Sequence, residues 1–216
     1  MSFTFTELLR MNRLRPAALV LSLSSIALLA SCVGPSPFRD PPSAASTAEK
    51  PIPARAALTN PGFESDKRGP RGDPEGWFSF QHAGDLSYRF TVDPNEKRSG
   101  AKSLRVDNVG REPYGAMSQS TPGAPHAGKV ARFSGWLKTR DANDNGAVLT
   151  LLALRSGATL SQNFMLDAPV KGTTGWKRYS IVLPLPAGTD AVEAGVMMRG
   201  KGSVWFDDAE LEFVTP

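Results

Sequence analysis

Residues 130–139 read VARFSGWLKT, and two sets of side chains alternate along this stretch. One set is Ala131, Phe133, Gly135 and Leu137, and the other is Arg132, Ser134, Trp136 and Lys138. Because successive side chains of an extended chain point to opposite faces, this pattern predicts a strand with one buried face. Short runs of this kind, separated by Gly, Pro, Asn and Asp, fill residues 58–216 and predict an all-β fold.

The expected strands are short and numerous. They are residues 77–81, 86–92, 103–106, 115–120, 130–139, 147–155, 162–166, 176–183, 192–198 and 204–213. Residues 147–155 are apolar on both faces, so we expect this strand to lie centrally. No long segment has a helical period. The pattern predicts a two-sheet antiparallel β-sandwich, or jelly roll.

The first 31 residues have the layout of an export signal. Basic residues precede an apolar run at 17–30, which is shorter than the about 20 residues that a membrane-spanning helix needs. The run ends in Leu29-Ala30-Ser31-Cys32, which resembles the lipobox of bacterial lipoproteins. That resemblance implies cleavage before Cys32 and its acylation, for example by palmitate. A plain secretory signal is the alternative. Val33 in place of Asp favours the outer membrane, again by resemblance, with the domain facing the periplasm or the cell surface.

Residues 32–57 are dense in Pro, Ala and Ser and contain few large apolar side chains, so they predict a disordered linker. The expected organisation is a signal peptide at 1–31, an acylated cysteine with its linker at 32–57, and one domain at 58–216. Cys32 is the only cysteine, so no disulfide is expected within the chain. The net charge of +4 is small for 216 residues and does not indicate a nucleic-acid partner.

Several short phrases recur in an order known from one fold family. They are NPGFE at 60–64, GW at 76–77, SGAKSL at 99–104, FSGWLK at 133–138, GWKRY at 175–179 and VWFDDAEL at 204–211. Together they resemble the galactose-binding-like jelly rolls, in particular the carbohydrate-binding modules of families four, nine and twenty-two. The resemblance covers residues 57–214 and implies a carbohydrate ligand, although this fold supports many functions.

The same resemblance implies a structural calcium ion that ties the first strand to the last. Its ligands would be Glu64 with Asp207 or Asp208, and carboxylate oxygens suit calcium. The alternative is that the two aspartates cap a strand and Glu64 faces water.

Sugar-binding modules combine aromatic rings with polar side chains that reach hydroxyl groups. The residues expected to bind a ligand are Trp136, Tyr114, Arg132, Gln119 and Arg199. Trp136 shares a strand face with Arg132, and Tyr114 lies in a loop before the strand that carries Gln119. The competing expectation is a place in the core, which we favour for Trp77, Trp176 and Trp205 and weigh evenly for Trp136.

Two other motifs have simpler explanations. The segment DANDNG at 141–146 imitates half of a calcium-binding EF-hand loop, but Leu152 stands where that loop needs a glutamate. Asn145-Gly146 therefore predicts a hairpin turn. His82 and His126 are expected at the surface.

Asp208, Glu210 and Glu212 alternate near the end of the chain, and paired carboxylates can hydrolyse glycosides. A solvated outer face is the favoured explanation, because the sequence offers no catalytic constellation. The leading hypothesis is a non-catalytic envelope lipoprotein that binds a glycan. The alternatives are a structural or assembly lipoprotein that binds a protein partner, and a weak glycoside hydrolase. The three hypotheses predict different geometries. Glycan binding predicts exposed aromatic rings beside a groove, and a protein partner predicts buried rings with a flat apolar patch elsewhere. Hydrolysis predicts two carboxylates that face each other in a cleft.

Overall fold

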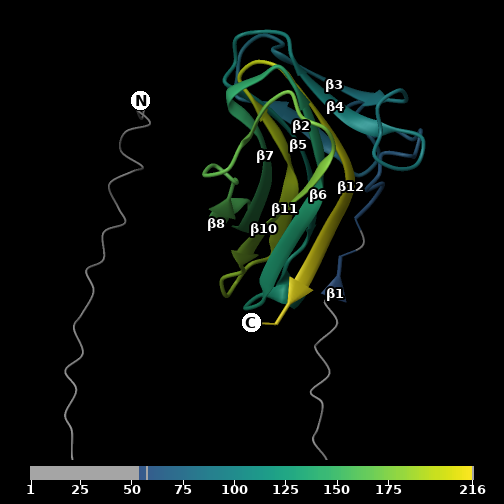
Figure 1. Cartoon of the computed structure of the whole chain (residues 1–216). Helices are drawn as coiled ribbons and strands as arrows, with labels where there is room; N and C mark the ends of the chain where they lie inside the picture. Colours follow the sequence, from purple (N-terminus) through teal and green to yellow (C-terminus); the bar gives the residue numbers. More distant parts are fainter. Residues whose placement is uncertain (1–53, 57, 216) are drawn as a thin grey trace, which may run out of the picture. The chain divides into compact units, whose positions relative to one another are not determined.

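The computed structural model describes residues 54–56 and 58–215, which form an all-β sandwich of two antiparallel sheets (Figure 1). The expected signal peptide, Cys32 and most of the expected linker fall outside these residues. The sandwich begins at Ala54, inside the expected linker, because Ala54–Arg55 pair with the last strand. No helix in the described part of the chain has the length and apolarity needed to cross a membrane.

Sheet I has the strand order β10-β6-β12-β4-β3, with β1 added to β12. Its strands are β1 (Ala54–Arg55), β3 (Tyr88–Asp93), β4 (Ser103–Asn108), β6 (Val130–Arg140), β10 (Lys177–Pro184) and β12 (Ser203–Val214). Sheet II has the order β2-β5-β11-β7-β8, with β9 added to β7. Its strands are β2 (Phe78–Gln81), β5 (Tyr114–Pro122), β7 (Ala142–Arg155), β8 (Ala158–Asn163), β9 (Val170–Gly172) and β11 (Ala191–Arg199). A 3-10 turn, η1 (Ala124–His126), is the one helical element among the described residues.

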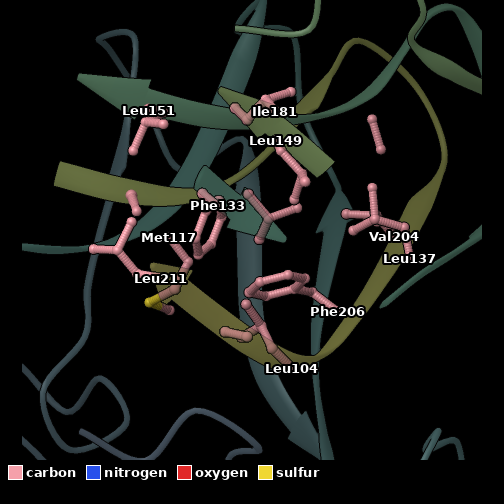
Figure 2. Packing of buried hydrophobic residues seen from close by; sticks show 14 of the residues in the cluster. Leu104, Met117, Phe133, Leu137, Leu149, Leu151, Ile181, Val204, Phe206 and Leu211 are labelled. Atoms are coloured by element: carbon pink, nitrogen blue, oxygen red, sulfur yellow. The ribbon is translucent and has the colours of Figure 1, made fainter. Parts of the chain in front are cut away.

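The core lies between the sheets and is built from alternate residues of the central strands (Figure 2). Phe133 and Phe206 come from sheet I, and Met117 and Leu149 from sheet II; all four are fully buried. Burying a side chain of this size contributes about 1.5–3 kcal/mol. Gly135 keeps the space that Phe206 needs, because a Cβ at position 135 would lie 2.3 Å from the Phe206 ring. The alternation of residues 130–139 is thus confirmed.

Most expected strands are present, and β7 is an inner strand of sheet II as expected. The prediction of a strand at 162–166 was wrong, because β8 runs from Ala158 to Asn163. A tight turn at Ser156 and Gly157, both with positive φ, returns the chain at once from β7 to β8. The Asp190 carboxylate accepts a 2.7 Å hydrogen bond from the Ser156 N–H, which holds this turn.

The hairpin predicted at Asn145-Gly146 was also wrong. The chain turns at Asp141, whose φ is 53°, and passes from β6 in sheet I to β7 in sheet II. Gly146 lies within β7 and has a φ of 61°. A Cβ there would lie 2.6 Å from the carbonyl oxygen of Val170, so the glycine lets β9 approach β7. The Asn-Gly pair marks an irregular strand and not a hairpin.

Candidate functional site

The five residues expected to bind a ligand lie on three different faces. Trp136 and Arg132 project from β6 on the outer face of sheet I. Tyr114 and Arg199 are direct partners across β5 and β11 in sheet II. Gln119 points inward. The structure therefore brings together Tyr114 and Arg199, and separately Trp136 and Arg132.

Gln119 is buried and serves the fold. Its Oε1 accepts a 2.6 Å hydrogen bond from the Thr59 N–H, and its Nε2 donates one of 2.9 Å to the Thr59 carbonyl. These two bonds fasten the entry segment of the domain to β5. The prediction that Gln119 contacts a ligand was wrong, because both ends of its amide are already paired inside the protein.

Trp136 is half-buried, and the guanidinium of Arg98 lies 4.2 Å from its ring centroid. A cation over an aromatic face is an attractive contact, and here it occupies one face of the Trp136 ring. The neighbouring arginines are also engaged: Arg132 lies 3.5 Å from a Glu212 oxygen, and Arg178 pairs with Glu210 and with Ser134. The outer face of sheet I is thus occupied by its own charges.

The carboxylates considered for hydrolysis lie at and after an irregularity in β12. The pairing of β12 with β6 is irregular between Asp207 and Glu210, and Asp208 lies in that bulge with a φ of 51°. The expected alternation of the three acids is nevertheless kept, because Ala209 and Leu211 between them are buried in the core. Glu210 and Glu212 do share a face, where Arg55 lies 2.7 Å from one and 3.7 Å from the other. Each is an ion-pair partner on an outer face, which agrees with the favoured explanation.

The residues expected to hold calcium do meet, around the loop of residues 98–102. Asp207 Oδ2 accepts hydrogen bonds from the N–H groups of Arg98 and Ser99 at 2.9 and 3.2 Å. Asp208 Oδ1 accepts one of 2.7 Å from the Ser99 hydroxyl. The Glu64 carboxylate accepts from the N–H groups of Ala101 and Lys102.

The oxygens predicted to bind calcium already accept hydrogen bonds from the protein. N–H groups face the carboxylate oxygens that a cation would need, and the described residues contain no cluster of three His, Cys, Asp or Glu with metal-binding geometry. Burial raises the pKa of the fully buried Asp207 carboxyl to about 6, although hydrogen bonds from Arg98 and Ser99 oppose this rise. Glu64 and Asp207 therefore act as a carboxylate clasp on the loop amides, and a calcium ion would have to displace these N–H groups. Calcium binding stays an untested prediction.

The outer face of sheet II has a different character, and we call it the sheet II face. Its residues fall into rows that run across the strands. The polar row is Phe78, Ser118, Gly195 and Thr150; the apolar row is Phe80, Ala116, Met197 and Val148; the acidic row is Ser120, Glu193, Leu152 and Gln162. Tyr114 and Arg199 close the face at one end.

In the polar row, Ser118 and Thr150 are 1% and 2% exposed. The Thr150 hydroxyl has no hydrogen-bond partner among the described residues, and the Ser118 hydroxyl has only a weak contact with the Glu193 carboxyl. Gly195 lies directly between them, with Ser118 on one side and Thr150 on the other. A Cβ at position 195 would lie 2.2 Å from the Met117 carbonyl oxygen and 2.6 Å from the Ser118 hydroxyl. An unpaired buried hydroxyl costs about 1–3 kcal/mol, so the Thr150 hydroxyl in this row requires an explanation.

Aromatic and apolar side chains surround this row. Phe78 and Phe80 stack with ring centroids 6.1 Å apart, and Phe80 is 38% exposed. Ala116, Val148 and Met197 form a small cluster separate from the main core, against which Tyr114 and Met165 pack. The sheet II face therefore combines exposed ring surface with buried polar groups.

Glu193 is the acidic residue of the acidic row on the sheet II face. It is half-buried, and burial raises the pKa of its carboxyl. A weak hydrogen bond from the Ser118 hydroxyl to this carboxyl opposes the rise. Gln162 at the far end of the acidic row is exposed. These two side chains can accept or donate hydrogen bonds to a polar ligand.

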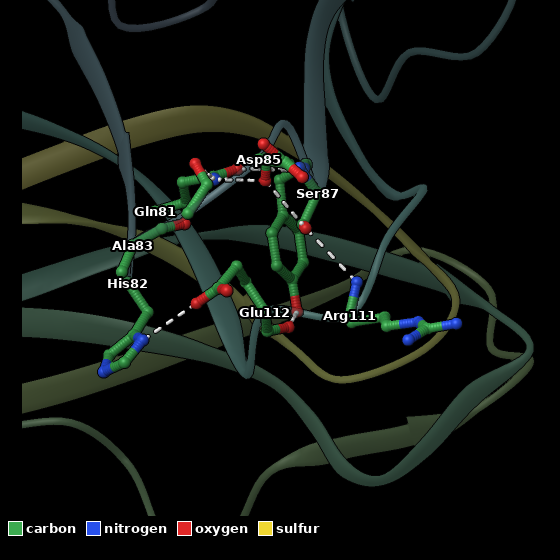
Figure 3. Close-up of polar contacts among 9 residues, drawn as sticks. Gln81, His82, Ala83, Asp85, Ser87, Arg111 and Glu112 are labelled. Atoms are coloured by element: carbon green, nitrogen blue, oxygen red, sulfur yellow. Dashed lines mark hydrogen bonds and ion pairs between the residues drawn. The ribbon is translucent and has the colours of Figure 1, made fainter.

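A loop organised by Gln81 borders the Tyr114 end of the face (Figure 3). Gln81 Oε1 accepts from the Ser87 N–H at 2.9 Å, and its Nε2 donates to the Ala83 and Asp85 carbonyls at 2.7 and 2.8 Å. His82 Nδ1 lies 2.8 Å from Glu112 Oε2, and the His82 ring meets the Tyr114 ring edge-on with centroids 5.6 Å apart. His82 is exposed as expected, but it belongs to the border of this face.

Sequence reasoning missed most of the sheet II face. The alternation of Phe78 and Phe80 within the expected strand at 77–81 was the one available signal. Ser118, Thr150 and Glu193 carry no local signal, because only strand pairing brings them together.

The two antiparallel sheets form a jelly-roll sandwich, a fold that solved carbohydrate-binding modules share. A comparable solved structure is the CBM22-1 xylan-binding domain of Xyn10C from Paenibacillus barcinonensis, with a TM-score of 0.51, 17% identity, and coverage of 77% of this chain and 99% of that chain. A Stig cyclase, Fisc, from Fischerella sp. TAU has a TM-score of 0.55 at 10% identity and covers 76% of this chain and 99% of that chain. At these identities the likeness establishes the fold alone.

No protein-family model matches the chain. Among curated proteins, an uncharacterized HTH-type transcriptional regulator, YbfP, of Bacillus subtilis is 30% identical over 119 residues, which are 55% of this chain. The chain spans about two fifths of that relative's length, as the match covers 40% of it. The same jelly roll thus occurs in a xylan-binding domain and in a cyclase.

Proposed function

We propose that this chain is a non-catalytic lipoprotein of the cell envelope that binds a glycan on the sheet II face. The observation that carries the proposal is the polar row, where the buried hydroxyls of Ser118 and Thr150 flank Gly195 and that of Thr150 has no partner among the described residues. A sugar hydroxyl both donates and accepts, so it can supply the partner that the Thr150 hydroxyl lacks. Gly195 places no side chain of its own between Ser118 and Thr150, and the Ser118 hydroxyl fills part of that space.

The aromatic surroundings support the same ligand class. Pyranose rings present an apolar face of C–H groups. Phe80, at the β2 end of the apolar row, and Tyr114, which packs against that row, offer ring surface for such a face. Binding sites of this kind join apolar area with a few placed polar groups. A xylan-binding domain of the same fold is consistent with a carbohydrate, and the arginine partners of Glu210 and Glu212 favour binding over hydrolysis.

The envelope anchor rests on the sequence. Acylation of Cys32 after the Leu29-Ala30-Ser31 motif would tether the domain through residues 33–53. Radiolabelled palmitate incorporated by the producing cells, and lost in Cys32→Ser, tests this part independently of any ligand.

The glycan test uses the purified chain on an array of xylan- and glucan-derived oligosaccharides. Thr150→Val removes one unpaired hydroxyl with little change of shape. We expect it to leave stability unchanged or slightly higher and to weaken the strongest array hit about tenfold, as expected for one lost ligand hydrogen bond. Thr139→Val is the matched control, because the Thr139 hydroxyl is buried and already paired with Thr174 at 3.0 Å. That variant should lose stability and keep its affinity.

A protein partner is the second candidate, and one observation favours it. Leu86 is 72% exposed and Val109 45% exposed, and the Val109 N–H donates to the Ser87 carbonyl, so the two side chains belong to adjoining loops. A blank array, together with envelope crosslinks that Leu86→Ser abolishes, would favour this candidate over glycan binding.

A further inference from the structure

We propose that the glycan site continues beyond the edge of sheet II into a groove between β8 and β10, so that the ligand is an extended oligosaccharide bound along its length. This inference rests on the proposed function and names the ligand class more closely. The groove is an open pocket of about 500 Å³ that continues into a second of about 280 Å³. The first is lined chiefly by Gln162, Phe164, Leu166, Asp167, Val182 and Pro184.

The groove is continuous with the sheet II face. Gln162 closes the acidic row on β8 and also lines the first pocket. Asn163, Asp167 and Val182 line both pockets, which joins the two hollows along β10. Paired strands lie about 4.8 Å apart, so β2 and β8, which are four strand spacings apart in sheet II, are separated by about 19 Å. A ligand that crosses the strands and enters the groove must therefore be several sugar rings long.

The chemistry of the groove resembles that of the face. Leu166 and Val182 are 51% and 48% exposed, which is a large exposure for neighbouring apolar side chains. Phe164 is half-buried beside them, and the amide of Gln162 and the carboxylate of Asp167 are exposed at the rim. Apolar surface with a polar rim is typical of a binding groove.

The edge of β10 argues against a peptide strand as the occupant. Asn163 Nδ2 donates a 2.9 Å hydrogen bond to the Val182 carbonyl, and the Ser161 hydroxyl donates one of 3.3 Å to the Pro184 carbonyl. Carbonyls that an added strand would pair with are therefore taken by side chains of β8, and Pro184 has no N–H to offer. A ligand that binds through its surface and hydroxyl groups meets no such obstacle.

The test measures affinity against chain length, by titration calorimetry with a trisaccharide and a hexasaccharide of the glycan that the array identifies. We expect Leu166→Ser to weaken the hexasaccharide about tenfold and to leave the trisaccharide unchanged, since only the longer chain reaches the groove. Leu160→Ser is the matched control: Leu160 is a 40% exposed leucine of β8 that does not line the pocket. It should change neither affinity. Thermal unfolding verifies that both variants fold.

The outcomes separate the two proposals. If Leu166→Ser weakens both oligosaccharides equally, or weakens neither, the groove is not part of the binding site. Binding to the sheet II face would still stand. If Thr150→Val also leaves both affinities unchanged, or if no oligosaccharide binds the unaltered chain, the proposed glycan function fails and the groove inference fails with it.

Discussion

The backbone N–H of Arg98 donates a 2.9 Å hydrogen bond to Oδ2 of Asp207, a carboxylate with no exposed surface. The same loop places the Arg98 guanidinium over the Trp136 ring. Asp207 on β12 therefore holds the loop that places the Arg98 guanidinium over the ring of Trp136.

Asp207 should make the stability of the domain depend on pH. Burial raises its pKa to about 6 in the folded state, above the ordinary value of 3.8 that it regains on unfolding. The folded state thus holds the proton more tightly, so the free energy of unfolding should fall as the pH rises from about 4 to about 6 and then level off. The shift corresponds to about 3 kcal/mol at most.

Urea unfolding at several pH values between 4 and 7 measures this contribution. Asp207→Asn keeps an acceptor for the loop N–H groups and cannot ionise. The free energy of unfolding of this variant should therefore not decrease between pH 4 and pH 6. Asp208→Asn, at the more exposed neighbour, is the control and should keep it. Parallel pH profiles for the unaltered chain and Asp207→Asn would contradict the assignment.

Calcium should have little effect on stability. Loop N–H groups already occupy the oxygens of Glu64 and Asp207 that the ion would need. We therefore expect the unfolding temperature to be the same, within about a degree, in excess calcium and in a chelator, because binding to the folded state alone would raise it. A calcium-dependent rise of several degrees, lost in Glu64→Gln, would show instead that the loop reorganises around a metal.

Mutations of the aromatic rings should locate the glycan on one sheet. Phe80→Ala removes an exposed ring of the sheet II face and should weaken glycan affinity about tenfold, a typical result for a lost stacking contact. Trp136→Ala should leave the affinity unchanged, because Arg98 occupies one face of that ring. The reverse pattern in the same titrations would place the site on sheet I.

Gly135→Ala should destabilise the domain. The added Cβ would lie 2.3 Å from the Phe206 ring in the centre of the core, and overpacking of this kind costs about 1–3 kcal/mol. Gly175→Ala is the matched control, since nothing lies within 4 Å of the added atom. Thermal and urea unfolding of the two variants provide the comparison, and equal stabilities would show that Phe206 moves aside freely.

The alternation in residues 130–139 and in similar runs predicted the strands, the two sheets and the buried places of Phe133 and Leu137. This succeeded because the period of two along a strand is a local property, readable from neighbouring residues. The ordered phrases likewise led to the jelly roll. Where a local feature misled, a backbone conformation intervened: positive φ at Asp141 placed the turn before the Asn145-Gly146 pair.

The sheet II face was decided by the tertiary structure alone. Ser118, Gly195 and Thr150 come from three strands that are far apart in the chain, and only the pairing of β5, β11 and β7 sets them side by side. The same holds for the cation over Trp136, since Arg98 reaches it through a loop that Asp207 fastens. The sequence by itself determined which segments become strands and which of their faces are buried. Register between distant strands decided which polar groups meet, because pairing is a long-range choice that depends on the packing of the whole core.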